Sequence, residues 1–228
     1  MTQKSQPGAY PWSYSKLKAF QTCPKQYYHE RVKQDYKQPE SDAMRYGNQF
    51  HKAAENLIAT DTPMPKKFEF AMPTLRRLVA LQGDKHPEIK MGLTEDMKPC
   101  GFFEKSKVWY RGVADLIVVN GKRASVFDHK TGGSTKYADP GQLELMALST
   151  FAHYPKVETI KAALLFFVPR EIVKRSYSRD DIPQLWDKWV GEYEELEAAH
   201  EHDVFNPKPS GLCRKHCIVT CCEHNGAY

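Results

Sequence analysis

The stretch that decides the fold of this chain is residues 112–131, which read GVADLIVVNGKRASVFDHKT. Two runs rich in β-branched and aromatic residues, 108–119 and 123–131, flank the dipeptide Asn120-Gly121. Such a dipeptide between two apolar runs is the strongest short-range signal for a two-residue hairpin turn. The sequence therefore predicts a pair of antiparallel strands near the middle of the chain.

This hairpin gathers charged residues on one face. With Asn120-Gly121 as the turn, Asp115, Asp128 and Lys130 project from the same side of the sheet, because side chains alternate with a period of two. Asp115 and Asp128 are then diagonal neighbours, roughly 7–8 Å apart at the backbone. The other residues of that face are apolar: Val113, Ile117, Ala124 and Val126.

Two carboxylates among apolar neighbours indicate a cation site. They repel each other and are costly to ionise unless a cation lies between them. Hard oxygen ligands suit Mg²⁺ or Mn²⁺, which polarise phosphates and activate water, and Lys130 could hold the water or the phosphate. The alternative is an ordinary solvated hairpin face, and a three-residue turn would separate Asp115 from Asp128.

The rest of the chain alternates helical and strand patterns. Ser13 is expected to cap a first helix, Thr22 a second, and the box formed by Ser178 and Asp181 a long helix near the C-terminus. Further helices are expected over residues 44–59, over residues 70–83 and from Asp139-Pro140 onward, and further strands over residues 161–169 and 172–178. This order predicts an α/β fold with one mixed central sheet flanked by helices.

Composition sets the broad class of protein. The chain has 228 residues, of which 41% are hydrophobic and 27% charged, with a net charge of +5. It has no segment with the apolar length of a membrane helix and no apolar secretory signal, so no membrane association and a cytoplasmic location are expected. The mild positive charge alone does not decide between nucleic acid and other partners.

The cysteines gather at the C-terminus. Of the six cysteines, four lie within the last sixteen residues: Cys213, Cys217, Cys221 and Cys222. In a chain with no export signal, such a cluster favours metal binding over disulfide formation. Cys100 lies outside this pattern and is expected to be a core residue.

The central motif resembles that of a known nuclease family. GVADLIVVNGKRASVFDHKTG followed by QLELMA is similar to the RecB-like exonuclease branch of the PD-(D/E)XK nuclease superfamily. The resemblance extends to a helix histidine in YGNQFHKAAE and to an early cysteine in TCPKQYYHERV, and it covers most of the chain. It implies a restriction-endonuclease-like core.

The resemblance also implies an active site. His51, Asp115, Asp128 and the backbone carbonyl of His129 would bind the catalytic Mg²⁺ or Mn²⁺. Lys130 would be the catalytic lysine, acting together with Asp115 and Asp128. Gln142 would orient that lysine or the scissile phosphate. The family usually has a tyrosine four residues after this glutamine, and here that position is Met146.

Several RecB-like nucleases, including CRISPR-associated and AddB-type ones, hold a 4Fe-4S iron–sulfur cluster with four cysteines. The resemblance implies Cys23, Cys213, Cys217 and Cys222 as the ligands here. The first tail spacing is C-x3-C where the family commonly has C-x2-C, and Cys221 remains an alternative to Cys222. A tetrahedral zinc site, with His216 or His224 as substitute ligands, fits the same residues.

The sequence as a whole predicts a metal-dependent deoxyribonuclease, an exonuclease on single-stranded DNA or DNA ends, with a helicase, recombination or CRISPR-type partner protein. One nuclease domain would span residues 1–228, with an N-terminal helical part (1–60), a catalytic sheet core (108–178) and a cysteine-rich tail (205–228). The alternatives are a non-catalytic nucleic-acid-binding or assembly protein on a nuclease fold, and a zinc-binding regulator that acts through its tail.

Overall fold

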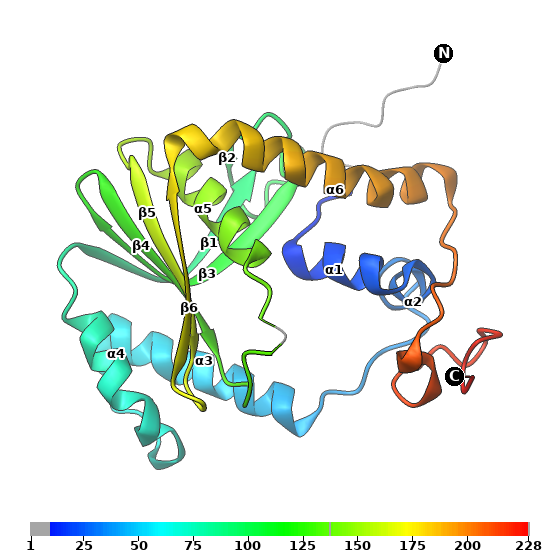
Figure 1. The fold of residues 1–228 in the computed structure, drawn as a ribbon, viewed down its shortest axis with the longest axis horizontal. Coiled ribbons are helices and arrows are strands. Elements are labelled where there is room, and N and C mark those ends of the chain that lie inside the picture. The colour runs from blue at the N-terminus through cyan, green and yellow to red at the C-terminus, as the bar shows by residue number, and fades with distance from the viewer. Residues whose placement is uncertain (1–9, 137, 228) are drawn as a thin grey trace.

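The centre of the molecule is a six-stranded mixed sheet (Figure 1). The computed structural model describes residues 10–136 and 138–227. The strands lie in the order β2-β1-β3-β4-β5-β6; β4 and β5 are parallel, and the other neighbours are antiparallel. Their bounds are β1 Asp84–Leu93, β2 Pro99–Cys100, β3 Tyr110–Asn120, β4 Arg123–Lys130, β5 Thr159–Phe166 and β6 Glu171–Ser178.

Helices cover both faces of this sheet, which confirms the predicted α/β architecture. The helices are α1 Tyr14–Thr22, α2 Pro24–Tyr27, α3 Asp42–Thr60, α4 Met72–Val79, α5 Gly141–His153 and α6 Ile182–His202. A π-helical turn, η1 Tyr28–Val32, continues α2, and 3-10 turns lie at Lys66–Ala71, Arg179–Asp181 and Gly211–Arg214.

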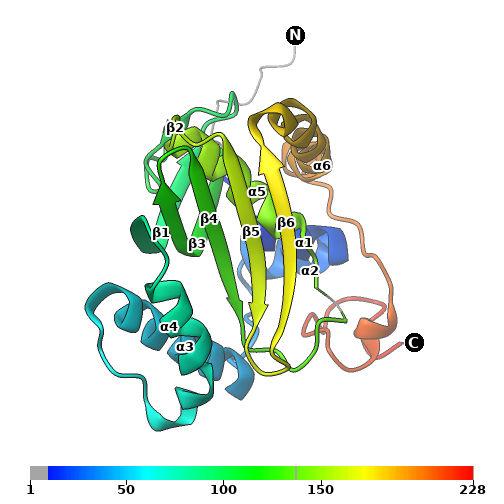
Figure 2. The same ribbon diagram turned by 60° about the vertical axis from the view of Figure 1, so that its left-hand side comes forward.

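Three apolar clusters hold these layers together. One packs α5 onto one face of the sheet through Leu143, Met146 and Phe151. A second packs α3 and α4 onto the opposite face, where Phe50 is fully buried. The third joins α1 and α6 to the start of β3 around Trp12, and the two views show α6 running along one end of the sheet (Figures 1 and 2).

The central hairpin forms as predicted, but its turn is displaced. Asn120 pairs with Arg123, so Gly121 and Lys122 are the turn residues instead of Asn120 and Gly121. Gly121 adopts a φ of 59°, the left-handed conformation that such a turn requires and that glycine adopts without steric cost. The shift changes which residues face each other across β3 and β4.

Most predicted helices are confirmed, with two corrections. Ser13 caps α1, and Ser178 and Asp181 form the expected box before α6. Thr22 was a wrong cap, because it is the last residue of α1 and Cys23 precedes α2. Residues 70–83 are helical only in part, and the strand β1 that follows was not expected, although Ile89, Met91 and Leu93 alternate as strand residues do.

The C-terminal tail returns to the N-terminal helices. Lys25 forms an ion pair of 2.7 Å with Glu223, and the hydroxyl groups of Tyr36 and Thr220 lie 3.0 Å apart. These contacts join residues almost two hundred positions apart, so the two ends of the fold lie side by side (Figure 1). Among the residues that the structure describes, no helix has the length and apolarity needed to cross a membrane.

Candidate active site

The candidate site lies where the β3–β4 ladder opens. The last paired residues of this ladder are Leu116 and Phe127, whereas residues 128–130 of β4 stay paired with β5. Continuing the register by one residue would set Asp115 opposite Asp128. There the strands separate, and the carboxylate of Asp115 accepts a hydrogen bond from the backbone N–H of His129. An opened ladder thus exposes backbone polar groups beside two buried carboxylates.

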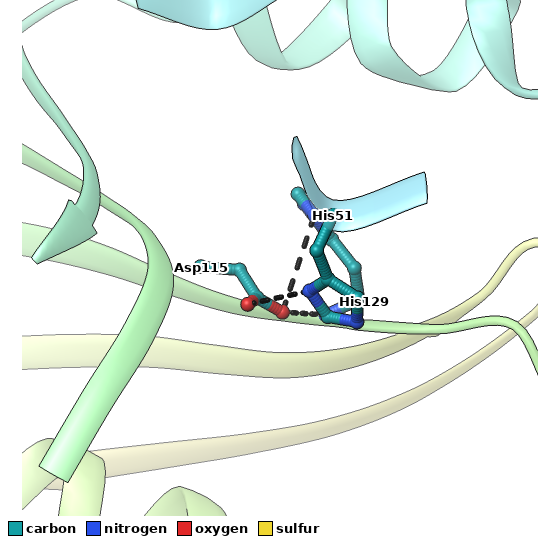
Figure 3. A group of neighbouring side chains, drawn as sticks. All are labelled: His51, Asp115 and His129. Atoms are coloured by element: carbon teal, nitrogen blue, oxygen red, sulfur yellow. Dashed lines mark hydrogen bonds and ion pairs between the residues drawn. The ribbon is translucent and has the colours of Figure 1, made fainter. Parts of the chain in front are cut away.

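The helix α3 brings His51 onto this opening (Figure 3). Its apolar face is anchored by Phe50 and Leu57, so the neighbouring His51 is directed toward the strands. His51 Nδ1 lies 2.8 Å from Asp115 Oδ1. Together with the His129 side chain these residues form a group whose potential ligand atoms all lie within 4.8 Å of one another.

Charge and burial shift the pKa values of this pair. Burial lowers the pKa of His51, but the hydrogen bond to Asp115 and the nearby carboxylates outweigh burial and raise it. Burial raises the pKa of Asp115, yet the bonds and charges of His51 and His129 leave it lowered. Asp115 is therefore held as a carboxylate, the form that a metal ion binds.

The side chain of His129 is a contributor that the sequence did not predict. The resemblance implied only its backbone carbonyl, whereas the structure brings the imidazole itself into the group. Burial lowers the pKa of His129 to about 4, so the ring is neutral near pH 7. Its Nε2 atom is buried and makes no hydrogen bond to any described residue, which is unusual for a buried ring nitrogen.

Asp128, Lys130 and Gln142 form a second, contiguous set. Lys130 Nζ lies 2.7 Å from Asp128 Oδ2 and donates a hydrogen bond of 2.9 Å to Gln142 Oε1. The Gln142 amide in turn donates a bond of 2.7 Å to Asp128 Oδ1. Gln142 opens α5, so these contacts come from the α5 side of the sheet, while Asp115 is contacted from α3.

A bound cation would stabilise the ionised form of Asp128. Burial raises its pKa, the charge of Lys130 acts in the opposite direction, and the charge of Asp115 raises it further. A buried carboxyl with a raised pKa is costly to ionise, and a metal ion removes that cost. A divalent ion between Asp115 and Asp128 would thus be bound by both carboxylates.

Glu88 is a further acidic residue at the opening. It lies on β1 beside Asp115, 3.9 Å from His51 Nδ1, and its φ of 47° is in the left-handed region. Burial and the charge of Asp115 raise its pKa. A non-glycine residue in this conformation costs of order 1–3 kcal/mol and often marks a functional site.

The donor set fits a divalent cation. Carboxylate oxygens with one or two imidazole nitrogens are ligands for Mn²⁺, and carboxylates with water suit Mg²⁺. Among the described residues the buried His129 Nε2 has no hydrogen-bond partner, and it is an acceptor of the kind that a cation or its water satisfies, whereas Asp128 Oδ2 is already paired with Lys130. The chain can therefore hold a metal ion at this opening.

A family model matches the N-terminal part of the chain. The family model described as the PD-(D/E)XK nuclease superfamily matches residues 11–90. The matched segment contains Cys23, His51 and Glu88 and ends before Asp115 and Asp128. The chain is thus similar to the PD-(D/E)XK nuclease superfamily over residues 11–90.

Solved structures provide the comparison for the fold. A protein from Eubacterium rectale named "Putative exonuclease" matches with a TM-score of 0.56 and 12% identity, over 99% of this chain and 94% of that chain. A protein named SSO0001 matches with a TM-score of 0.48 and 16% identity, over 99% and 90% of the two chains. No curated protein matches the sequence. At 12% identity the likeness to the structure from Eubacterium rectale concerns the fold alone.

The four cysteines expected to bind a cluster lie together. Cys23, Cys213, Cys217 and Cys222 line one small cavity between the start of α2 and the tail. Backbone N–H groups of Lys208 and Ser210 point at the Sγ atoms of Cys23 and Cys213, at 3.5 and 3.4 Å. Thiolates that bind metals commonly accept such bonds, so the four residues fit a metal centre.

Cys221 points elsewhere. Its Sγ atom lies 3.7 Å from His29 Nε2, and its backbone N–H bonds to the Tyr36 hydroxyl. It is exposed and does not line the cavity of the other four thiols. This arrangement favours Cys222 over Cys221 as the fourth member. Cys100 lies apart on the short edge strand β2.

Proposed function

We propose that this chain is a metal-dependent DNA nuclease that hydrolyses phosphodiester bonds. The observation that carries the proposal is the meeting of His51 and Asp115 with the Asp128–Lys130 pair at the opened end of β3 and β4. Nuclease chemistry needs carboxylates to hold a cation beside a positive group for the phosphate, and this opening offers both. The superfamily match and the exonuclease-named structural neighbour point the same way.

The metal would be held by His51, Asp115, Asp128 and the backbone carbonyl of His129, with the His129 imidazole near enough to contribute. A bound Mg²⁺ or Mn²⁺ polarises the phosphate and lowers the pKa of a water molecule. Asp115 suits this role because its carboxylate is stabilised by His51 and by the His129 backbone N–H.

Lys130 would stabilise the charge on the scissile phosphate, and Gln142 would hold Lys130 in position. The ammonium group of Lys130 can stabilise negative charge that develops on the phosphate oxygens, an effect that is strong in a partly dry site. Gln142 bonds both Lys130 and Asp128, so it keeps the ammonium group from rotating away from the carboxylate. We therefore assign Lys130 the catalytic role and Gln142 a positioning role.

The finer activity follows from the RecB-like resemblance. We propose an exonuclease that acts on single-stranded DNA or DNA ends, located in the cytoplasm and supplied with substrate by a helicase, recombination or CRISPR-type partner protein. Cys23, Cys213, Cys217 and Cys222 would bind a 4Fe-4S cluster, or zinc, that fixes the tail to α2.

Cleavage of end-labelled DNA tests the proposal. Single- and double-stranded substrates are incubated with Mg²⁺, Mn²⁺ or EDTA, and wild type is compared with Lys130→Ala. The matched control is Lys161→Ala, which removes an exposed lysine of β5 away from the opening. We expect metal-dependent cleavage that falls at least 100-fold in Lys130→Ala and is unchanged in Lys161→Ala.

The rival function predicts a different result. A non-catalytic DNA-binding protein would bind DNA in a salt-sensitive manner but show no metal-dependent cleavage in any of these proteins. Cleavage that persists at the wild-type rate in Lys130→Ala would contradict the assignment of Lys130. The spacing of the labelled products distinguishes stepwise removal from an end from internal cutting.

A further inference from the structure

A cleft adjoins the candidate active site on the α5 side of the sheet. Lys130 and Gln142 line one part of it. Its other walls come from the N-terminal segment before and within α1, from the loop after β2 and from the start of β3. The cleft encloses about 630 Å³, within the range of roughly 300–1,000 Å³ that ligand pockets have.

Two cations in this cleft lack carboxylate partners. Lys16 and Arg111 both line it, and neither forms an ion pair with any residue in the described ranges. Lys16 Nζ donates only to the Pro11 carbonyl, at 2.9 Å, and the buried Arg111 Nε makes no hydrogen bond. By contrast, Lys18, two residues away on the same helix, is paired with Asp139 at 3.3 Å.

The positive charges of Lys16 and Arg111 are also close enough to repel each other. Burial lowers the pKa of Lys16, and the charges of Arg111 and Arg31 lower it further. The fold enforces this proximity, because the Arg111 backbone N–H donates to the Trp12 carbonyl at 2.8 Å and so docks the start of α1 beside β3. An anion placed between the two cations would relieve the repulsion.

The cleft also presents an aromatic ring. Phe102 is half-buried in its wall, with the Arg111 guanidinium 5.6 Å from the ring centre. A ring of this kind can stack on a nucleobase only where the base is unpaired, since paired bases are stacked on one another. A cationic wall beside an aromatic platform is the combination that binds single strands.

The distance along β3 separates the cleft from the proposed metal site. Arg111 and Asp115 lie four residues apart on β3, roughly 13 Å along a strand. One phosphate group cannot contact both positions, so the phosphate at Arg111 would differ from the one at the metal centre.

We propose that this cleft is a single-strand binding subsite, in which Lys16 and Arg111 hold a non-scissile phosphate and Phe102 stacks on a base of the same DNA strand. The proposal rests on the proposed nuclease function and names its substrate: a single strand that enters over the start of α1 and leads to Lys130. A duplex, whose bases are not free, gains the phosphate contact but not the stacking contact.

Binding measured without turnover tests the subsite. All proteins carry Asp128→Asn to suppress cleavage, and the anisotropy of a labelled oligo-thymidine and of a labelled duplex hairpin is titrated with Mg²⁺ present. We expect Lys16→Gln with Arg111→Gln to weaken single-strand binding at least tenfold and to lower the slope of log K against log salt by about 1. The matched control, Arg123→Gln with Lys174→Gln, removes two exposed charges elsewhere and should change affinity less than threefold.

A separate variant tests the proposed stacking contact of Phe102. Phe102→Ala should weaken binding of the single strand about tenfold and leave the duplex unchanged. Arg111→Lys keeps the charge and should retain most of the affinity, and a thermal melt of each variant shows that it is folded.

Distinct outcomes overturn distinct claims. Equal losses in the cleft double variant and its control would overturn the subsite, and an equal loss for single strand and duplex in Phe102→Ala would overturn single-strand selectivity. Absence of cleavage by the protein without Asp128→Asn, with the binding pattern intact, would instead overturn the nuclease function.

Discussion

Asp115 occupies the centre of the candidate site because it is bonded from two directions. His51 contacts one of its oxygens, and the backbone N–H of His129 contacts the other. The sequence predicted that Asp115, Asp128, Lys130 and His51 belong together, through spacing and through the family resemblance. It could not predict the contact of Glu88, because that contact depends on a φ of 47° that interrupts the alternation of β1.

His51 should make metal binding depend on pH. Its pKa is raised by Asp115, so a proton competes with the metal up to a higher pH than at an ordinary histidine. Below that pKa the affinity for Mn²⁺ should fall by up to about tenfold per pH unit. Calorimetric titration of Mn²⁺ at pH 6, 7 and 8 measures this dependence.

The matching variant is His51→Gln, which cannot take up a proton in this range. It should bind Mn²⁺ more weakly at pH 8 and show a flatter dependence between pH 6 and 8. An unchanged pH dependence in this variant would mean that another group, not His51, is responsible.

At the scale of elements, the sequence pattern predicted the central hairpin, the strand β5 and the helix α5, but not that β5 lies parallel to β4. The register of the hairpin was less predictable. Asn120-Gly121 has the composition of a turn, yet Gly121-Lys122 forms it, because the C-terminal end of β3 lies one residue further along than expected and Asn120 still pairs with β4. A displacement of this size leaves the alternation of faces unchanged, and it turns Asp115 and Asp128 from diagonal neighbours into directly opposite positions of the continued register.

The turn offers a test of that register. Gly121→Ala places a Cβ at a φ of 59°, where nothing lies within 4 Å, so the cost is backbone strain of roughly 1–2 kcal/mol. We expect the melting temperature to fall by about 2–8 °C. Gly133→Ala is the control, since it also has open space around its Cβ but no positive φ. Equal melting temperatures for the two variants would show that Gly121 is not the strained turn residue.

At the scale of the whole molecule, the sequence predicted an α/β fold and a link between Cys23 and the tail. It could not predict how the tail lies, because contacts such as Lys25 with Glu223 depend on the path of the chain around α6. The sequence likewise could not predict that residues 10–16 lie beside β3, since the backbone pairing there is a single β-bridge between Trp12 and Tyr110.

The metal content of two variants should distinguish the roles of the adjacent residues Cys221 and Cys222. Cys222→Ser should lose most of the bound iron or zinc and lower the melting temperature by several degrees, because the proposed metal centre would join α2 to the tail. Cys221→Ser, whose thiol contacts His29 instead, should keep its metal. Elemental analysis of both purified variants with thermal melts measures this, and loss of metal from Cys221→Ser alone would reverse the assignment.

The most direct test of the proposed metal-dependent nuclease site measures cleavage of single-stranded DNA as a function of Mn²⁺ concentration. Wild type, Asp115→Asn and Asp128→Asn are compared, because these carboxylates are the groups placed to hold the metal at the opening of β3 and β4. We expect saturable activation of the wild type and, in each variant, at least a tenfold higher Mn²⁺ requirement or no activity. Wild-type activation curves in both variants would contradict it.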